Sequence, residues 1–151
     1  MIRFPSLAAQ ATLAAAAVSL SLSLSLPADA APLRPDHPLI GTWILYLTSQ
    51  SCEETYVIRE DGSTVVWSGQ EISESVSTFD DKPRPTGFFR WDDKIVKDNG
   101  KPDCQGQVMD PGGEITNYIK LDTDGETFVM CRQENLNECL GPLVRQPRKK
   151  I

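Results

Sequence analysis

Histidine is nearly absent from this sequence: His37 is the only one, and it lies between Asp36 and Pro38. A catalytic histidine is held rigidly beside a nucleophile or a carboxylate, whereas we expect this one to lie in an exposed loop. No second histidine is left to serve as the base of a nucleophilic site. No C-x-x-C pair is present either, so the cysteine spacing that zinc sites need is missing. The sequence therefore predicts neither an enzyme nor a metal site, and we expect no cofactor.

Basic residues are outnumbered, since 15 lysines and arginines stand against 21 aspartates and glutamates, and the net charge is −6. Proteins that bind nucleic acids or anionic lipid surfaces present a basic stripe. The only basic cluster here is the tail, residues 146–151, which follows the last apolar run and contains a proline. We expect this tail to be a solvated, frayed terminus, and we expect no nucleic-acid partner.

The acidic residues form doublets, such as Glu53-Glu54 and Asp92-Asp93. Adjacent residues of a strand point to opposite faces, so a doublet does not place two carboxylates across one cleft as glycosidases require. Glu54, Tyr56 and Ile58 are two positions apart, so on a strand their side chains point to the same face. If Tyr56 and Ile58 face the core, the Glu54 carboxylate is predicted to face it as well. Such a buried charge needs a partner, either an arginine in a buried ion pair or a polar group of a ligand.

Calcium is suggested by two acidic segments, residues 98–103 and 122–126. Neither segment matches the twelve-residue loop of an EF-hand with its terminal glutamate. Their Asn-Gly and Asp-Gly pairs are typical of turns. We therefore expect no calcium site.

Residues 1–30 have the three regions of a secretory signal peptide. Arg3 precedes an uncharged, alanine- and leucine-rich stretch over residues 7–26, and the small-residue run Ala28-Asp29-Ala30 follows. The pattern predicts cleavage after Ala30. A retained membrane anchor is the alternative, because 20 uncharged residues could span a bilayer, but alternating serines dilute the hydrophobicity. We expect an exported protein, periplasmic or secreted, with no transmembrane segment after cleavage.

All four cysteines lie after the predicted cleavage site. An even number of cysteines in an exported chain indicates disulfides. Cys131 and Cys139 are placed symmetrically about Asn135, as two cysteines facing each other across a hairpin would be. The spacing favours a Cys131–Cys139 disulfide, which leaves Cys52–Cys104 by elimination.

The chain after residue 30 shows short β-rich runs separated by turn signals, and no convincing 3.6-residue apolar period. Asp61-Gly62 and Asp124-Gly125 predict two hairpins, and we expect a third with its turn at Asp92-Asp93. Residues 31–38 are predicted to form an extended lead-in, and residues 39–145 a single domain. The predicted fold is all-β: a small antiparallel up-and-down barrel of about eight strands.

A family resemblance accompanies these patterns. Gly41-Thr42-Trp43 opens the first predicted strand and Arg145 ends the last. This arrangement resembles that of the lipocalins and the wider calycins, although the central T-D-Y motif is absent. Cys52-x-Glu54, Asp98-Asn99-Gly100 and Cys139-x-Gly141-Pro142-Leu143 are similar to motifs of small exported bacterial proteins called lipocalin-like. The resemblance covers residues 39–145, and it implies a barrel whose closed end is formed by an arginine lying over a tryptophan ring.

The resemblance implies a binding protein for a small, partly apolar or amphipathic molecule. We expect the pocket wall to include aromatic and polar side chains near strand ends, namely Glu54, Tyr56, Trp67, Phe88 and Trp91. Core packing is the expected role of Trp43. The alternative is an envelope or secreted protein-interaction or inhibitor module with a solidly packed barrel. A cavity of about 300 Å³ or more favours ligand binding, whereas a filled barrel with an exposed aromatic patch favours the module.

Overall fold

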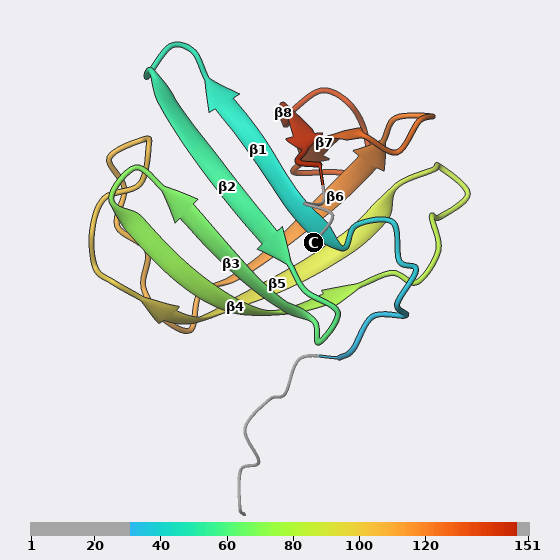
Figure 1. Cartoon of the computed structure of the whole chain (residues 1–151), viewed down its shortest axis with the longest axis horizontal. Coiled ribbons are helices and arrows are strands. Elements are labelled where there is room, and N and C mark those ends of the chain that lie inside the picture. The colour runs from blue at the N-terminus through green and yellow to red at the C-terminus, as the bar shows by residue number, and fades with distance from the viewer. Residues whose placement is uncertain (1–30, 148–151) are drawn as a thin grey trace, which may run out of the picture.

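The computed structural model describes residues 31–147, so the predicted signal peptide (1–30) and residues 148–151 of the predicted tail lie outside the described residues. Eight strands form one closed barrel in which neighbours in sequence pair antiparallel and β8 pairs with β1 (Figure 1). This confirms the predicted all-β barrel. The strands are β1 (Gly41–Leu47), β2 (Cys52–Ile58), β3 (Ser63–Ser68), β4 (Glu71–Phe79), β5 (Phe89–Asp98), β6 (Glu114–Leu121), β7 (Thr127–Cys131) and β8 (Cys139–Arg145). Within residues 31–147 there is no helix with the length and apolarity that a membrane crossing requires.

Both predicted Asp-Gly hairpins are present, as the β2–β3 and β6–β7 turns. Gly62 and Gly125 have φ angles of +80° and +72°, which glycine adopts without the steric penalty of a side chain. In each turn the aspartate carboxylate accepts a hydrogen bond from the backbone N–H two residues further along, at 2.9 Å for Asp61 and 2.8 Å for Asp124. These local bonds fix the turn positions and therefore the register of the hairpins.

The predicted hairpin at Asp92-Asp93 is wrong, because β5 runs through both residues. Each carboxylate is accommodated within the sheet. Asp92 accepts a hydrogen bond from the Thr116 hydroxyl of β6 at 2.6 Å, and Asp93 accepts one from the Ser77 hydroxyl of β4. Cross-strand hydroxyls therefore make the acidic doublet compatible with a strand.

The closed end of the barrel is formed by Trp43 and Arg145, as the resemblance implies. The guanidinium carbon lies 4.0 Å from the centroid of the Trp43 ring, a geometry that favours a cation–π interaction. The guanidinium also donates hydrogen bonds to the carbonyl groups of Pro38, Ile40 and Gly125, at 2.6 Å, 3.0 Å and 3.0 Å. Arg145 thus joins the lead-in, β1 and the β6–β7 turn at one point.

Gly41 and Trp43 are both fitted closely to this closure. A Cβ atom on Gly41 would lie 2.9 Å from a guanidinium nitrogen of Arg145, and the residue has a φ of +143°. Trp43 is fully buried, packs edge-to-face on Phe128 at a centroid distance of 4.6 Å, and donates its indole N–H to the Leu39 carbonyl at 2.8 Å. The apolar core is therefore centred on this half of the barrel.

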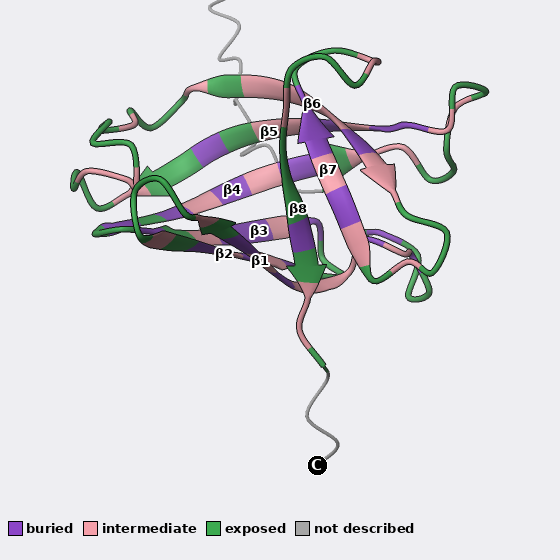
Figure 2. Cartoon of the chain, turned by 90° about the horizontal axis from the view of Figure 1, so that it is seen from above, coloured by how far each residue is buried: buried purple, intermediate pink, exposed green. Residues whose placement is uncertain are grey.

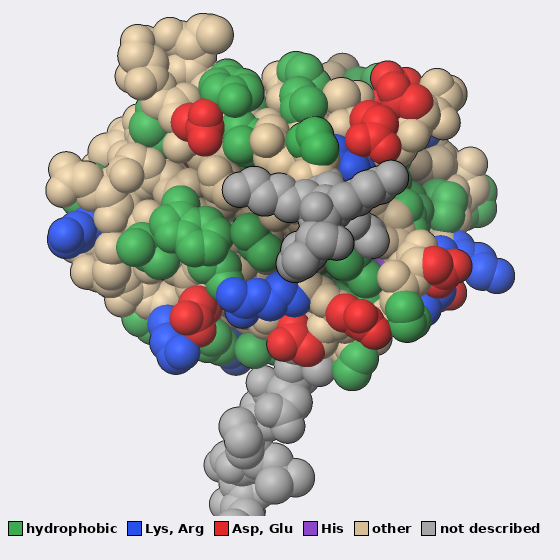
Figure 3. All heavy atoms as spheres, in the orientation of Figure 1, with side chains coloured by type: hydrophobic (Ala, Val, Ile, Leu, Met, Phe, Trp, Pro, Cys, Tyr) green, Lys and Arg blue, Asp and Glu red, His purple; other side chains and the backbone are tan. Residues whose placement is uncertain are grey.

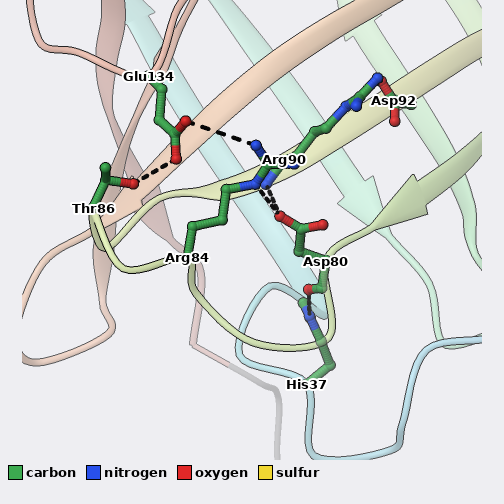
Figure 4. Close-up of polar contacts among 7 residues, drawn as sticks. All are labelled: His37, Asp80, Arg84, Thr86, Arg90, Asp92 and Glu134. Carbon is green, nitrogen blue, oxygen red and sulfur yellow. Dashed lines mark hydrogen bonds and ion pairs between the residues drawn. The ribbon is translucent and has the colours of Figure 1, made fainter.

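The lead-in is not extended as predicted. It folds through turns across the closed end, and Leu33 and Leu39 are buried there. The prediction that His37 is exposed is also wrong, since only 3% of its surface is accessible. Its Nε2 donates to the Asp80 carbonyl at 3.0 Å (Figure 4), and its Nδ1 accepts from the Leu39 N–H at 3.3 Å. Burial lowers the pKa of His37, so this imidazole is a neutral structural group at pH 7.

A network of ion pairs and hydrogen bonds holds the long β4–β5 connection, residues 80–88, against the barrel (Figure 4). The Asp80 carboxylate accepts from the Arg84 side chain at 2.7 Å and from the Arg90 N–H at 3.0 Å. Arg84 also lies 3.7 Å from Glu134 in the β7–β8 connection, which accepts a hydrogen bond from Thr86. Every one of these side chains has a partner, so the network has a structural role.

Candidate functional site

A cavity of about 440 Å³ occupies the half of the barrel opposite the Trp43–Arg145 closure. Because the strands alternate in direction, the β1–β2, β3–β4, β5–β6 and β7–β8 connections all lie at this open end. Figure 2 shows how buried and less buried residues alternate along β4 and β7, as expected for strands with one inner face. The cavity is lined by Glu54, Tyr56, Val66, Ser68, Glu71, Ser73, Trp91, Asp93, Ile95, Asp103, Gln105, Met109, Ile115, Asn117, Met130, Cys131, Arg132, Glu138, Cys139 and Leu140.

Two disulfides lie beside the cavity, with the predicted connectivity. Cys52–Cys104 joins the first residue of β2 to the β5–β6 connection, residues 99–113. Cys131–Cys139 joins the end of β7 to the start of β8. The 99–113 connection is held further by the Cys104 N–H, which donates to the Ser68 hydroxyl at 3.0 Å. The mouth of the cavity is therefore built from covalently tethered segments.

Glu54 points into the barrel, as its parity with Tyr56 predicts, and is 5% exposed. Its carboxylate accepts hydrogen bonds from the Tyr56 hydroxyl at 2.6 Å and from the Ser68 hydroxyl at 2.7 Å. The predicted alternative of a buried ion pair with an arginine is wrong, because two hydroxyl groups satisfy this carboxylate instead. Burial, followed by the neighbouring Glu54 charge, raises the pKa of Tyr56 well above its ordinary value. Tyr56 is thus a neutral hydrogen-bond donor at physiological pH.

Glu71, the first residue of β4, is a lining carboxyl group whose hydrogen-bonding neighbour is not a hydroxyl group. It is 6% exposed, and its hydrogen-bonding neighbour is another acid, Asp98. Burial first, and then Asp98, raises the pKa of Glu71 to about 7. Asp98 Oδ2 is buried and accepts no hydrogen bond from an N–H or O–H donor of the described residues. A proton shared between the two carboxyl groups is the arrangement that satisfies both.

A stability prediction follows from the raised pKa of Glu71. The folded-state pKa of about 7 exceeds the ordinary value of 4.5, so the folded protein binds this proton more tightly and loses stability as the pH rises from about 4.5 to 7. Glu71→Gln keeps the neutral shape and can donate to Asp98. It should raise the free energy of unfolding at pH 8 by about 1–3 kcal/mol and change it little at pH 4.5. Urea unfolding at both pH values measures this, and an equal effect at both would contradict it.

Asp93 and Trp91 form a second polar site on β5. Asp93 accepts hydrogen bonds from the Trp91 indole at 3.2 Å and from the Ser77 hydroxyl. Burial raises the pKa of Asp93, while these hydrogen bonds act in the opposite direction. Trp91 is 2% exposed and stacks on Phe79 with a centroid distance of 5.1 Å. The indole is therefore held rigidly in the cavity wall.

Both polar and apolar side chains line the cavity. The carboxyl and hydroxyl groups described above come from β2, β3, β4 and β5. The lining side chains of β6 and β7 include the apolar Ile115 and Met130, and the 99–113 connection adds Met109. Within residues 31–147 no three His, Cys, Asp or Glu side chains gather closely enough to hold a metal ion.

The structure brings together three of the five predicted pocket residues, Glu54, Tyr56 and Trp91. Trp67 does not line the cavity. It is 40% exposed on the outer face of β3, because its neighbours Val66 and Ser68 occupy the inner positions. Sequence parity alone could not place this tryptophan, since both faces of β3 carry apolar residues.

Phe88 does not line the cavity either. It precedes β5, and the next residue, Phe89, belongs to the inner core, so Phe88 faces outward. It is nevertheless buried, and the Lys120 ammonium lies 5.1 Å from its ring centroid.

Sequence reasoning missed Glu71 and Asp93, and it also missed the polar inner face to which Glu71 belongs. A usable signal was present on β4, where Ser73, Ser75 and Ser77 share the parity of Glu71 and are all buried. A strand whose serines face inward indicates a polar or hollow interior rather than an apolar core. No family model, no curated protein and no solved structure matches this chain.

Proposed function

We propose that this protein is an exported, lipocalin-like binding protein that holds one small, partly apolar molecule inside its barrel. The observation that carries the proposal is the cavity of about 440 Å³, which falls in the size range of ligand sites, about 300–1,000 Å³. A solidly packed barrel, as a pure interaction module would have, leaves no such space. The pairing of Trp43 with Arg145 supports the lipocalin-like reading of the fold.

The distribution of polar groups also supports binding. Ligand pockets combine a mostly apolar lining with a few placed polar groups that orient the ligand. Here Trp91, Ile95 and Met130 provide apolar area, and Glu54 and Glu71 provide carboxyl groups in the same cavity. The apolar part would contribute most of the affinity through burial, while the carboxyl groups would fix the orientation.

Export is supported by the cysteines. All four are paired in disulfides and no free thiol remains, as is typical of chains that fold in an oxidising compartment. The signal-like residues 1–30 agree with this destination. We therefore place the binding function outside the cytoplasm.

The proposal predicts a co-purifying ligand. Native mass spectrometry of protein purified from its own host should show an adduct that dissociates on mild activation. Ser73→Phe adds a large side chain to the cavity wall and should abolish the adduct. Thr78→Phe adds the same side chain to the exposed outer side of the same strand and should leave the adduct in place. Repeated recovery of the bare chain, or equal adduct levels in both variants, would contradict a cavity ligand.

A second candidate function, a protein-interaction or inhibitor module, is favoured by the outer surface. Trp67 of β3 and Ile72 of β4 are direct cross-strand partners, and they are 40% and 46% exposed. Figure 3 shows hydrophobic side chains gathered on the face that carries β2 and β3. Exposed apolar patches of this kind mark many interaction sites. Two results together would favour this candidate. The unaltered chain would show no small-molecule adduct in the native mass spectrum, and a protein partner that binds the unaltered chain would no longer bind the Trp67→Ala variant.

A further inference from the structure

The proposed cavity is predominantly acidic, which restricts the charge of its ligand. Of the charged side chains that line it, one is basic, Arg132, and the others are Glu54, Glu71, Asp93, Asp103 and Glu138. A ligand with a carboxylate or phosphate head would bring a further negative charge next to partly buried carboxyl groups. That repulsion is strong in a low-dielectric site. The wall therefore disfavours anions and favours cations or neutral molecules.

The carboxyl groups are not equally available to a ligand. Glu54 already accepts hydrogen bonds from Tyr56 and Ser68, and Asp93 accepts them from Trp91 and Ser77. Glu71 differs from both, because its hydrogen-bonding neighbour is another acid, Asp98, whose buried Oδ2 has no hydrogen-bond partner among residues 31–147. When the shared proton is lost, the two neighbouring carboxylates repel each other, and a ligand that supplies positively charged donors would relieve this repulsion.

The remaining side chains near Glu71 suit the body of an organic cation rather than a bare metal ion. Tyr56 and Trp91 lie edge-to-face at a centroid distance of 6.4 Å, and both line the cavity with Ile95 and Met130. Aromatic rings attract cations through their faces, and the aliphatic side chains offer area for an apolar substituent. The cavity thus combines a pair of neighbouring acids, Glu71 and Asp98, with aromatic rings and apolar area.

We infer that the ligand of this cavity is a small amphipathic amine, whose ammonium group is held by Glu71 and whose apolar body lies against Trp91, Ile95 and Met130. The inference rests on the proposed function and specifies its ligand class. An ammonium group has three donors and no acceptor, so it can replace the shared proton between Glu71 and Asp98 when both carboxyl groups are ionised. Its positive charge also offsets the repulsion among the carboxyl groups.

The pH dependence of binding should reveal the ammonium–carboxylate contact. The charged groups around Glu71 are Glu54 of β2, Asp98 of β5 and Asp103 of the 99–113 connection, with Arg132 elsewhere on the wall. Burial and the acids raise the pKa of Glu71 to about 7, so the carboxylate that an ammonium requires forms as the pH rises through neutrality. Affinity for an amine should therefore increase between pH 6 and pH 8, and Glu71→Gln should remove most of this increase.

The decisive experiment compares three probes that share one apolar body: 1-naphthylmethylamine, 1-naphthylmethanol and 1-naphthoic acid. Each is titrated by calorimetry into the unaltered chain without its signal, into Glu71→Gln and into the exposed control Glu74→Gln. The amine should bind about tenfold more tightly than the alcohol, and the acid most weakly. Glu71→Gln should weaken amine binding about tenfold and leave alcohol binding nearly unchanged, which would show that the cavity itself is intact. Glu74→Gln should change neither.

The outcomes separate the ligand class from the proposed function. Alcohol binding at least as tight as amine binding would overturn the amine inference and leave the binding function standing. The amine inference would also be overturned if the acid bound most tightly of the three probes. It would be overturned as well if Glu71→Gln left the affinity for the amine unchanged. If none of the three probes binds, the amine inference fails, and the native mass spectrum decides separately whether the cavity holds any ligand.

Discussion

Substitution of Trp43 by alanine should lower the free energy of unfolding by about 3–5 kcal/mol, the range found for large aromatic side chains removed from protein cores. Trp43 is fully buried and contacts both Phe128 and the Arg145 guanidinium. Its removal leaves a void at the base of the barrel, and it also takes away the surface on which Arg145 lies. Urea unfolding followed by circular dichroism measures the loss.

Trp67→Ala is the matched control for this experiment, because it makes the same substitution on the same barrel at a residue that is 40% exposed. Its expected cost is about 1–2 kcal/mol, since this side chain is only partly buried and its removal leaves no cavity in the core. If the two variants lost similar stability, the closure at Trp43 would not be the structural centre that we describe.

Removal of the Cys52–Cys104 disulfide, by the double substitution Cys52→Ala and Cys104→Ala, should cost about 4 kcal/mol. The two cysteines are separated by 52 positions, so the bridge restricts a long loop of the unfolded chain. The Cys131–Cys139 bridge spans a separation of only 8, and the same chain-entropy relation gives about 2.5 kcal/mol for its removal. The longer loop should therefore make the larger contribution.

Urea unfolding of the two double variants tests this order. The Cys52–Cys104 variant should also bind the naphthyl probes more weakly, because the bridge holds the 99–113 connection, which supplies Asp103, Gln105 and Met109 to the cavity wall. A larger stability loss on removing Cys131–Cys139 would contradict the loop-length argument. Unchanged probe affinity would show that the tether has no part in shaping the mouth.

The features that were predictable from sequence depend on local chemistry or on fixed spacing. Asp61-Gly62 and Asp124-Gly125 form turns because the aspartate side chain and the glycine backbone suit a tight reversal by themselves. The Cys131–Cys139 bridge follows from symmetry about a hairpin. These predictions needed no knowledge of distant neighbours, and the structure agrees with them.

The features that could not be predicted depend on contacts between distant segments. The buried His37 donates a hydrogen bond to a carbonyl group 43 residues away, and the residues near it in the sequence do not indicate that partner. Asp92 stays within a strand because Thr116, 24 residues away, donates to it. The properties of the pocket residues also depend on distant segments, since the pKa of Glu71 is raised by burial and by Asp98 on the next strand.

Hydrophobic patterning was misleading on β4 for a further physical reason. Its more apolar face, which includes Ile72, lies outside, and its serine face lies inside. Patterning assumes that the interior is a packed apolar core, whereas here the inner face borders a cavity with polar groups. A reversed strand of this kind is itself a sign of a functional interior.

The three tryptophans provide a direct test of whether a small molecule enters the open end of the barrel. Trp91 lines the cavity, Trp43 is buried at the closed end, and Trp67 is exposed outside. On titration with uncharged 1-naphthylmethanol, nuclear magnetic resonance should show a shift of the Trp91 indole N–H signal, with the signals of Trp43 and Trp67 nearly unmoved. A shift confined to Trp67, or no shift at Trp91 up to the solubility limit of the probe, would contradict a binding site inside the barrel.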